Sequence, residues 1–268
     1  MAEPLVDQVG QVLRDAGRTV VVPLFRHLAE GDIEEKAPGE VVTVADREAE
    51  RVIGIGLREA LPGSVVVGEE AVAAEPALLD RLRDGGPVWL VDPVDGTANF
   101  AAGRGPFVMM VALLCDGVCR AGWIHDPLSG SLMTAERGGG ARLDGLPVRT
   151  PAGSPPEALR GVVASKYLPA PLRTQVATRA AGLGEVLPGQ HCAGREYPAI
   201  VAGGQEYTLF WRTLPWDHAA GALITEEAGG VVRRLDGTPY DPTVAGPPGL
   251  LAAVSEPVWG RVQAALFS

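Results

Sequence analysis

The sequence predicts a layered α/β fold in which helices alternate with strands. Segments with apolar residues at helical spacing, such as 5–20, precede short apolar runs rich in β-branched residues, such as 64–68. The chain has 268 residues, of which 46% are hydrophobic, so a large core is available and long disorder is not expected. We therefore expect one large domain or two closely packed ones.

The first third of the chain alternates helix and strand patterns around one polar loop. Pro23 is expected to end or kink the first helix. The stretch 31–40 is polar and contains Pro38 and Gly39, so it predicts a loop. Thr43 is a suitable N-cap for the second helix. The expected elements are helices over 5–20 and 44–60, a strand over 64–68 and a helix over 71–84.

A strand that runs into a turn is expected at the centre of the N-terminal half. The apolar run 88–91 predicts a buried strand, and Pro93 is expected to end it because proline cannot donate to a sheet ladder. Gly96 then frees the backbone for a turn, and Thr97 is a good N-cap for a short helix.

The same segment concentrates polar groups. Asp92 and Asp95 lie where the strand meets the turn, and the backbone N–H groups of Gly96 and Thr97 follow directly. Carboxylates bind hard cations, and free N–H groups at such a turn bind phosphate oxygens. The segment therefore predicts a site that holds a metal ion and a phosphate together.

The rest of the chain predicts an antiparallel series followed by alternating helices and strands. The proline-rich stretch 151–156 is the best candidate for a domain boundary, which divides the chain into domains 1–150 and 151–268. Asp116-Gly117 and Asp144-Gly145 are expected tight turns. The expected strands are 107–114, 118–125, 131–135, 142–148, 161–165, 207–211, 231–233 and 250–254, and the expected helices are 171–183, 196–203, 216–228 and 257–266.

Composition excludes several classes of function. The formal charge is −10 and the isoelectric point about 4.9, which argues against nonspecific binding to nucleic acid or anionic membranes. No apolar run reaches about 18 residues, so no transmembrane helix is expected. Residues 1–14 lack a signal-like apolar block, so we expect a cytoplasmic location. The odd count of cysteines, Cys115, Cys119 and Cys192, predicts free thiols rather than a metal site.

Three further acidic positions each have an ordinary explanation when considered alone. Asp46 falls in the first turn of a helix, where an acid suits the helix dipole. Asp217 starts the expected helix 216–228, where aspartate is a good N-cap. Glu69 and Glu70 follow a strand and, taken alone, are typical of solvated surface.

Considered together, four carboxylates indicate a metal site. Glu69, Asp92, Asp95 and Asp217 each lie at a strand end or a helix start. Four carboxylates in one pocket would repel one another and raise their pKa values unless cations neutralised them. Mg²⁺ is the hard, oxygen-preferring cation that accompanies phosphate in cells.

Two long motifs resemble the signatures of the inositol monophosphatase family. Segment 92–100 (DPVDGTANF) is similar to the first signature, and segment 216–230 (WDHAAG…EAGG) is similar to the second. Segments 68–70 (GEE) and 43–46 (TVAD) match two further family elements in the right order and spacing. The resemblance implies an αβαβα sandwich and a Mg²⁺-dependent, lithium-sensitive phosphomonoesterase that forms a homodimer. Its default substrate is inositol 1-phosphate.

The resemblance also implies two or three bound Mg²⁺ ions and the residues that coordinate them. Mn²⁺ or Ca²⁺ are expected to substitute for Mg²⁺. Glu69, Asp92 and the carbonyl of Val94 would hold one ion. Asp92, Asp95 and Asp217 would hold a second, and Glu69 would reach a third, weaker ion through water.

Catalytic roles follow from the same resemblance. Thr97 and Asp46 would orient and deprotonate the attacking water, and Glu69 is the third expected catalytic residue. The N–H groups of Gly96 and Thr97 would hold the phosphate, and Asp95 and Asp217 would also contact the substrate.

The chain departs from the family where inositol-specific members contact sugar hydroxyls through a glutamate. That place falls on Phe210 or Trp211. The nearest charge is Arg212, which is either a surface side chain or a cation that binds a second phosphate or a carboxylate. Arg195 is expected to face the pocket.

The substrate therefore stays open on the sequence. Besides inositol 1-phosphate, histidinol phosphate, fructose 1,6-bisphosphate and 3′-phosphoadenylate nucleotides fit the same chemistry. A non-catalytic binding protein that retains the fold is the alternative of a different class. Such a protein is expected to have lost carboxylates or the Thr–Asp pair, and this chain has them all.

Overall fold

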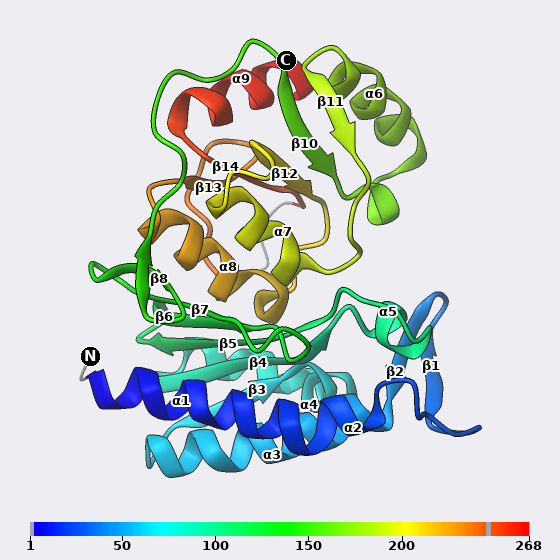
Figure 1. The fold of residues 1–268 in the computed structure, drawn as a ribbon, viewed down its shortest axis with the longest axis vertical. Helices are drawn as coiled ribbons and strands as arrows, with labels where there is room; N and C mark the ends of the chain where they lie inside the picture. The colour runs from blue at the N-terminus through cyan, green and yellow to red at the C-terminus, as the bar shows by residue number, and fades with distance from the viewer. Residues whose placement is uncertain (1–2, 245–247, 268) are drawn as a thin grey trace.

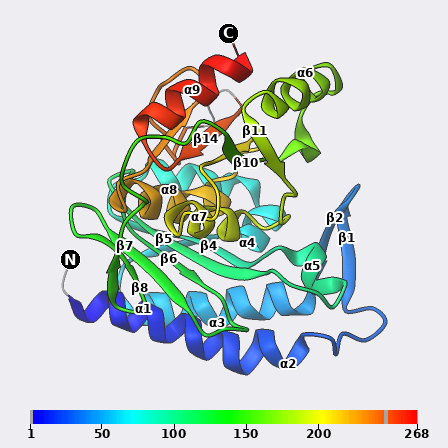
Figure 2. The ribbon, with the colours of Figure 1, turned by 45° about the horizontal axis from the view of Figure 1, so that its top comes forward.

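Five layers of secondary structure stack on one another in the computed structural model, which describes residues 3–244 and 248–267. Figures 1 and 2 show a helix layer, a seven-stranded sheet, a second helix layer, a five-stranded sheet and a third helix layer. This arrangement confirms the αβαβα sandwich that the family resemblance implies, and with it the predicted layered α/β class.

The first helix layer covers the outer face of the seven-stranded sheet. Helix α1 (Glu3–Ala16) continues through a π-helical turn (Gly17–Val21) into α2 (Val22–Leu24), so the predicted helix is confirmed and Pro23 stands in its last turn. Helix α3 (Val44–Ala60) packs beside α1 and against the sheet. Each helix buries apolar residues of its stripe completely, as at Leu13, Ile53 and Leu57.

The seven-stranded sheet has the order β3-β4-β5-β6-β7-β8-β9. Strand β3 runs parallel to β4, and every later pair is antiparallel. Asp116 and Gly117 have φ values of 52° and 75° and make the predicted tight turn. The strands are β3 (Val65–Gly68), β4 (Pro87–Asp95), β5 (Val108–Cys115), β6 (Val118–His125), β7 (Leu132–Glu136), β8 (Gly140–Leu143) and β9 (Leu146–Val148).

The second sheet and its helices come from the C-terminal half. Helices α7 (Ala193–Val201) and α8 (Pro215–Glu227) lie between the two sheets, and α6 (Ala170–Ala181) and α9 (Glu256–Phe267) cover the far face (Figures 1 and 2). The sheet order is β11-β10-β12-β14-β13. Its strands are β10 (Leu159–Val163), β11 (Gly184–Leu187), β12 (Tyr207–Phe210), β13 (Val231–Arg234) and β14 (Leu250–Ala253).

A β-hairpin replaces the loop that was predicted for residues 31–40. Strand β1 (Ile33–Ala37) pairs antiparallel with β2 (Glu40–Thr43). The side chains of β1 are almost all exposed, so the segment lacks the apolar alternation that predicts a strand. In Figures 1 and 2 the hairpin projects beside α5 (Thr97–Ala101) at one end of the seven-stranded sheet.

The helix predicted over 71–84 is also corrected. Helix α4 (Glu69–Ala74) starts two residues earlier, and a 3₁₀ helix (Pro76–Arg83) takes the place of its second half. Pro76 has no N–H group and disfavours the helical conformation at Glu75, so the α-helix ends there.

Strand β4 does not end at Pro93 as predicted. The ladder between β4 and β5 is interrupted between Asp92 and Asp95, and it resumes with Asp95 opposite Val108. Proline is tolerated at such an irregularity, where its missing N–H group is not needed by the ladder, so the strand continues through Pro93.

Within 3–244 and 248–267, we find no helix with the length and apolarity that a bilayer crossing requires. The three cysteines are free thiols, as the sequence predicts.

Candidate active site

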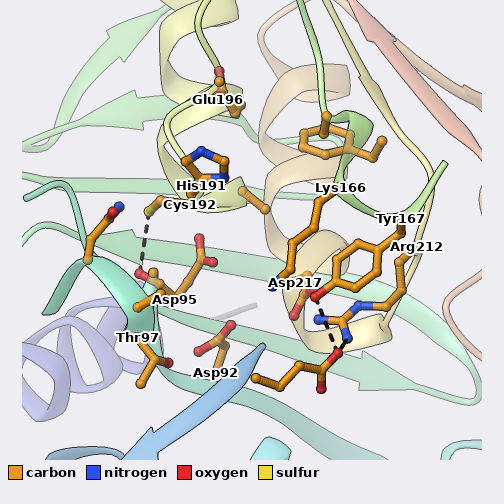
Figure 3. A pocket seen from close by; sticks show the side chains of 18 of the residues that line it. Asp92, Asp95, Thr97, Lys166, Tyr167, His191, Cys192, Glu196, Arg212 and Asp217 are labelled. Carbon is orange, nitrogen blue, oxygen red and sulfur yellow. Dashed lines mark hydrogen bonds and ion pairs between the residues drawn. The ribbon is translucent and has the colours of Figure 1, made fainter. Parts of the chain in front are cut away.

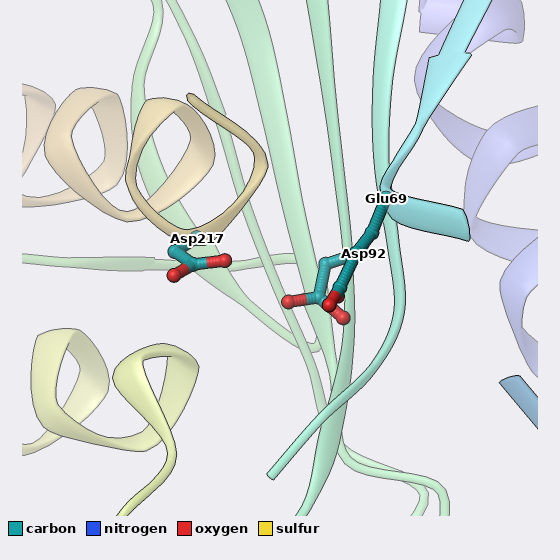
Figure 4. A group of neighbouring side chains, drawn as sticks. All are labelled: Glu69, Asp92 and Asp217. Atoms are coloured by element: carbon teal, nitrogen blue, oxygen red, sulfur yellow. The ribbon is translucent and has the colours of Figure 1, made fainter. Parts of the chain in front are cut away.

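Three carboxylates from distant parts of the chain converge at one end of the seven-stranded sheet. Glu69 starts α4, Asp92 lies in β4, and Asp217 lies in the first turn of α8. One oxygen from each lies within 4.8 Å of the others (Figure 4). Because β3 and β4 are parallel with Gly68 opposite Val91, the residues that follow these two are neighbours, and α8 brings Asp217 to them.

The electrostatics of this cluster suit a divalent cation. Burial raises the pKa of Asp92 well above its usual value, and Glu69, Asp95 and Asp217 raise it further. Burial likewise raises the pKa of Asp217, and Glu69 and Asp95 add to the effect. Buried carboxylates that repel one another are stable as anions when a cation neutralises them. The donor set of carboxylate oxygens therefore fits Mg²⁺.

Lys36 lies beside the cluster and was not identified from the sequence. Its Nζ is 2.9 Å from Oε1 of Glu69 and 2.6 Å from Oε1 of Glu70. Burial lowers the pKa of this ammonium, but the two carboxylates outweigh burial and raise it. Lys36 belongs to β1, in the segment predicted to be a loop, so no sequence pattern linked it to Glu69.

Asp95 lines the same pocket but faces a different neighbour (Figure 3). Its Oδ2 accepts the backbone N–H of Gly194 at 2.5 Å, and its carbonyl accepts the Sγ–H of Cys192 at 3.4 Å. Burial raises the pKa of Asp95 to about 6. The structure thus brings three of the four predicted carboxylates into one group and places Asp95 next to it, tied to the start of α7.

Thr97 and Asp46 form the predicted pair. Oγ1 of Thr97 lies 2.9 Å from Oδ1 of Asp46 and 3.0 Å from the carbonyl oxygen of Val94. Since a hydroxyl has one proton, donation to Asp46 leaves the carbonyl of Val94 free to bind another group. Asp46 is 1% exposed, and burial raises its pKa to about 6.

A capping box holds Asp46 in position. Its Oδ2 accepts the N–H of Thr43 at 2.8 Å and the Oγ1–H of Thr43 at 2.6 Å, at the start of α3. The helix cap and the contact with Thr97 use different oxygens of Asp46, so the two interactions do not compete.

Gly96, and not Thr97 as predicted, is the N-cap of α5. Its φ of +95° favours glycine, and a Cβ there would lie 2.9 Å from the carbonyl oxygen of Pro106. Thr97 is therefore the first residue of the helix, where its hydroxyl turns to Asp46. The first N–H groups of a helix lack partners within the helix, so this turn suits an anion.

The three clustered carboxylates, Asp95 and Thr97 line one pocket of about 680 Å³ (Figure 3). Arg212 lines the pocket as predicted, and so do Phe210 and Trp211. Further polar lining residues were not identified from the sequence. Among them are Lys36 and Glu40 on the hairpin, Arg104 in a loop, and Lys166 and Tyr167 in a short 3₁₀ helix (Ser165–Tyr167).

Arg195 is not brought to the pocket. In the described part of the chain, Arg195 is not among the residues that line the pocket, although Ala193 and Glu196 of the same helix are. Its Nη1 instead lies 3.4 Å from Oδ2 of Asp126, in the loop between β6 and β7. The prediction for Arg195 is corrected, because this ion pair turns the side chain toward the sheet.

Comparisons with known proteins agree with the geometry. Residues 2–262 match the model of the inositol monophosphatase family. An inositol-1-monophosphatase of Mesorhizobium japonicum is 33% identical over 87% of this chain and 86% of its own length. A fructose-1,6-bisphosphatase/inositol-1-monophosphatase of Thermotoga maritima is 29% identical over 85% of this chain and 83% of its own length.

Solved structures share the fold over nearly the whole chain. The extragenic suppressor protein suhB from Bartonella henselae superposes with a TM-score of 0.85 at 26% identity, covering 99% of each chain. Because the family model spans almost all of the sequence, the chain belongs to the inositol monophosphatase family.

Proposed function

We propose that this protein is a Mg²⁺-dependent phosphomonoesterase that hydrolyses a small sugar or polyol phosphate, with inositol 1-phosphate as the first candidate. One observation carries the proposal: Glu69, Asp92 and Asp217 converge in the pocket that also holds Thr97. Membership of a phosphatase family supports it.

The acidic residues would hold two or three Mg²⁺ ions, or Mn²⁺ or Ca²⁺ in their place. Glu69, Asp92 and Asp217 form the core of this donor set, and Asp95 and the carbonyl of Val94 lie next to it. Divalent cations there would lower the pKa of a water molecule and stabilise the charge on the departing oxygen.

The protein's own groups would position and deprotonate the attacking water. The Thr97 hydroxyl donates its hydrogen bond to Oδ1 of Asp46. When the Thr97 oxygen accepts a proton from the attacking water, its own proton can pass to Asp46. The N–H groups of Gly96 and Thr97 would donate to phosphate oxygens and keep the ester in line with the water.

Phosphate release tests the proposal. With inositol 1-phosphate and Mg²⁺, Asp92→Asn is expected to lower kcat at least a hundredfold, because it removes a shared ligand. Asp80→Asn is the matched control, since Asp80 is exposed and outside the pocket, and its kcat should stay within about twofold of wild type. Equal rates in wild type, Asp92→Asn and chelator-treated protein would refute the site.

A substrate panel addresses the finer question of which ester is used. Histidinol phosphate, fructose 1,6-bisphosphate and a 3′-phosphoadenylate nucleotide are the alternatives to inositol 1-phosphate. The Thermotoga maritima relative is named for two of these activities, which supports testing both. From the family resemblance we also expect inhibition by lithium and a homodimer, which an inhibition curve and light scattering would check.

A binding protein without catalysis is the second candidate class. The family includes relatives named for other roles, such as the suppressor protein suhB. We favour the enzyme because this chain keeps the carboxylate cluster and the Thr97–Asp46 pair together in an open pocket.

A further inference from the structure

Arg212 is held rigidly at the pocket although no strand or helix contains it. Its guanidinium lies 4.1 Å from the centre of the Tyr167 ring, and its carbonyl oxygen lies 2.9 Å from Nε2 of His218. His218 is 1% exposed, and its Nδ1 is 2.8 Å from the hydroxyl of Tyr197. Both the backbone and the side chain of Arg212 are therefore fixed, as in a site prepared for a ligand.

The carboxylate of Glu40 forms an ion pair with the Arg212 guanidinium. Oε1 of Glu40 accepts from Nη1 of Arg212 and, at 3.3 Å, from the hydroxyl of Tyr167 (Figure 3). The pair uses a single carboxylate oxygen, and Nε of Arg212 is buried without a hydrogen-bond partner in the described part of the chain. The Nη1–H and Nη2–H groups of an arginine can hold two oxygens of one anion, and the pair with Glu40 uses Nη1 alone.

A second cation stands beside the first. Nζ of Lys166 donates to the carbonyl of Gly39 at 2.9 Å, next to Glu40. Lys166, Tyr167 and Arg212 lie together in Figure 3, and Asp92, Asp95 and Thr97 lie on the other side of the same pocket. A substrate whose scissile phosphate sits at the acidic cluster would therefore extend toward two cations.

We infer that Arg212 and Lys166 bind a second phosphate of the substrate, and that Glu40 occupies Arg212 until that phosphate displaces it. This inference rests on the proposed function and narrows its substrates to sugar or nucleotide bisphosphates. Glu40 and Arg212 side chains are each 33% exposed, and ion pairs with this exposure are weak. A phosphate carries more charge than Glu40 and can accept from both Nη1 and Nη2, so it is the stronger partner.

Two esters with the same scissile group test the inference, fructose 1,6-bisphosphate and fructose 1-phosphate. Wild type should have the higher kcat/KM for the bisphosphate. Arg212→Gln should lower the ratio of the two kcat/KM values at least tenfold, because it removes the fork. Glu40→Gln should raise that ratio about threefold or more, because the neutral amide competes less with phosphate.

A matched pair on the same hairpin provides the control. Arg47 and Glu34 form an ion pair between α3 and β1 outside the pocket. Arg47→Gln therefore loosens the hairpin without touching the Arg212 site, and its ratio should stay within twofold of wild type. If Arg212→Gln and Glu40→Gln also stay within twofold, the inference is wrong.

Binding provides a readout that does not depend on turnover. In titration calorimetry with Ca²⁺, Arg212→Gln should bind fructose 1,6-bisphosphate at least tenfold more weakly than wild type, and equal affinities would overturn the inference. If wild type releases no phosphate from either ester, the proposed function fails, while the calorimetric comparison still decides whether Arg212 binds the second phosphate.

Discussion

Under the proposed mechanism, Asp46 would serve folding and catalysis through separate oxygens. Its Oδ2 closes the capping box with Thr43, and its Oδ1 accepts from Thr97. Burial raises its pKa to about 6, so the carboxylate exists above that pH and the neutral acid below it. Only the carboxylate can take the proton from Thr97, so the rate should depend on this titration.

We therefore predict an acid limb in the pH profile. With Mg²⁺ saturating, kcat should fall about tenfold per pH unit below the pKa of Asp46, which is about 6 without the ions and lower when cations lie nearby. Asp46→Asn should lower kcat about 10²- to 10³-fold and remove this limb, because the amide does not titrate. The measurement is kcat from pH 5 to 8 for both proteins. An acid limb that persists in Asp46→Asn would assign the titration to another group.

At the scale of elements, the contact between α7 and α8 depends on a residue without a side chain. A Cβ on Gly221 of α8 would lie 2.0 Å from Cδ2 of Tyr197 of α7. Tyr197 is fully buried and also contacts His218, so its ring has no room to move aside.

Gly221→Ala is predicted to destabilise the protein by roughly 1–3 kcal/mol through overpacking. Gly260 of α9 is the matched control, because it is exposed and a Cβ there would meet nothing within 4 Å. Gly260→Ala should stabilise by up to about 1 kcal/mol, since alanine is the better helix former. Urea denaturation measures both changes, and equal midpoints for the two variants would contradict the packing argument.

The elements that could be predicted from the sequence are those in which the spacing of apolar residues indicates a buried face. Strand β6 was predicted with its observed bounds, 118–125, because an apolar run follows a turn dipeptide. Strand β1 is mostly exposed and strand β11 carries only four residues at a sheet edge, so neither has an apolar pattern and neither was predicted. The 3₁₀ helix after Pro76 has helical spacing without α geometry, which periodicity does not distinguish.

At the scale of the whole molecule, the site depends on contacts that link distant segments. The motifs around Asp92 and Asp217 could be identified because their residues are adjacent in the chain. Lys36 could not be identified in this way, since it reaches its ion pair with Glu69 only through the position of the hairpin. Arg195 was misassigned for the same reason, because its partner Asp126 belongs to another element. Motifs thus predicted the chemistry, and tertiary contacts decided which charged side chains reach it.

Mg²⁺ is predicted to stabilise the folded protein by neutralising the carboxylate cluster. Without a cation, burial and mutual repulsion raise the pKa of Asp92 and of Asp217 in the folded protein. The folded state then holds these protons to higher pH than the unfolded chain, whose aspartates titrate near pH 4. Stability from this cluster therefore decreases as pH rises above about 4, and a cation that binds the ionised form offsets the loss.

At pH 8, Mg²⁺ at about 100 times its dissociation constant should raise the melting temperature by roughly 5–10 °C over chelated protein, and by less at pH 5.5. Asp92→Asn should melt above wild type in chelator, because it removes a buried charge, and should show little response to Mg²⁺. Asp80→Asn should behave as wild type in both conditions, since Asp80 is exposed and outside the cluster. Equal Mg²⁺ responses in wild type and Asp92→Asn would mean that the ion binds elsewhere, because only an ion held by Asp92 can relieve the repulsion that Asp92 creates.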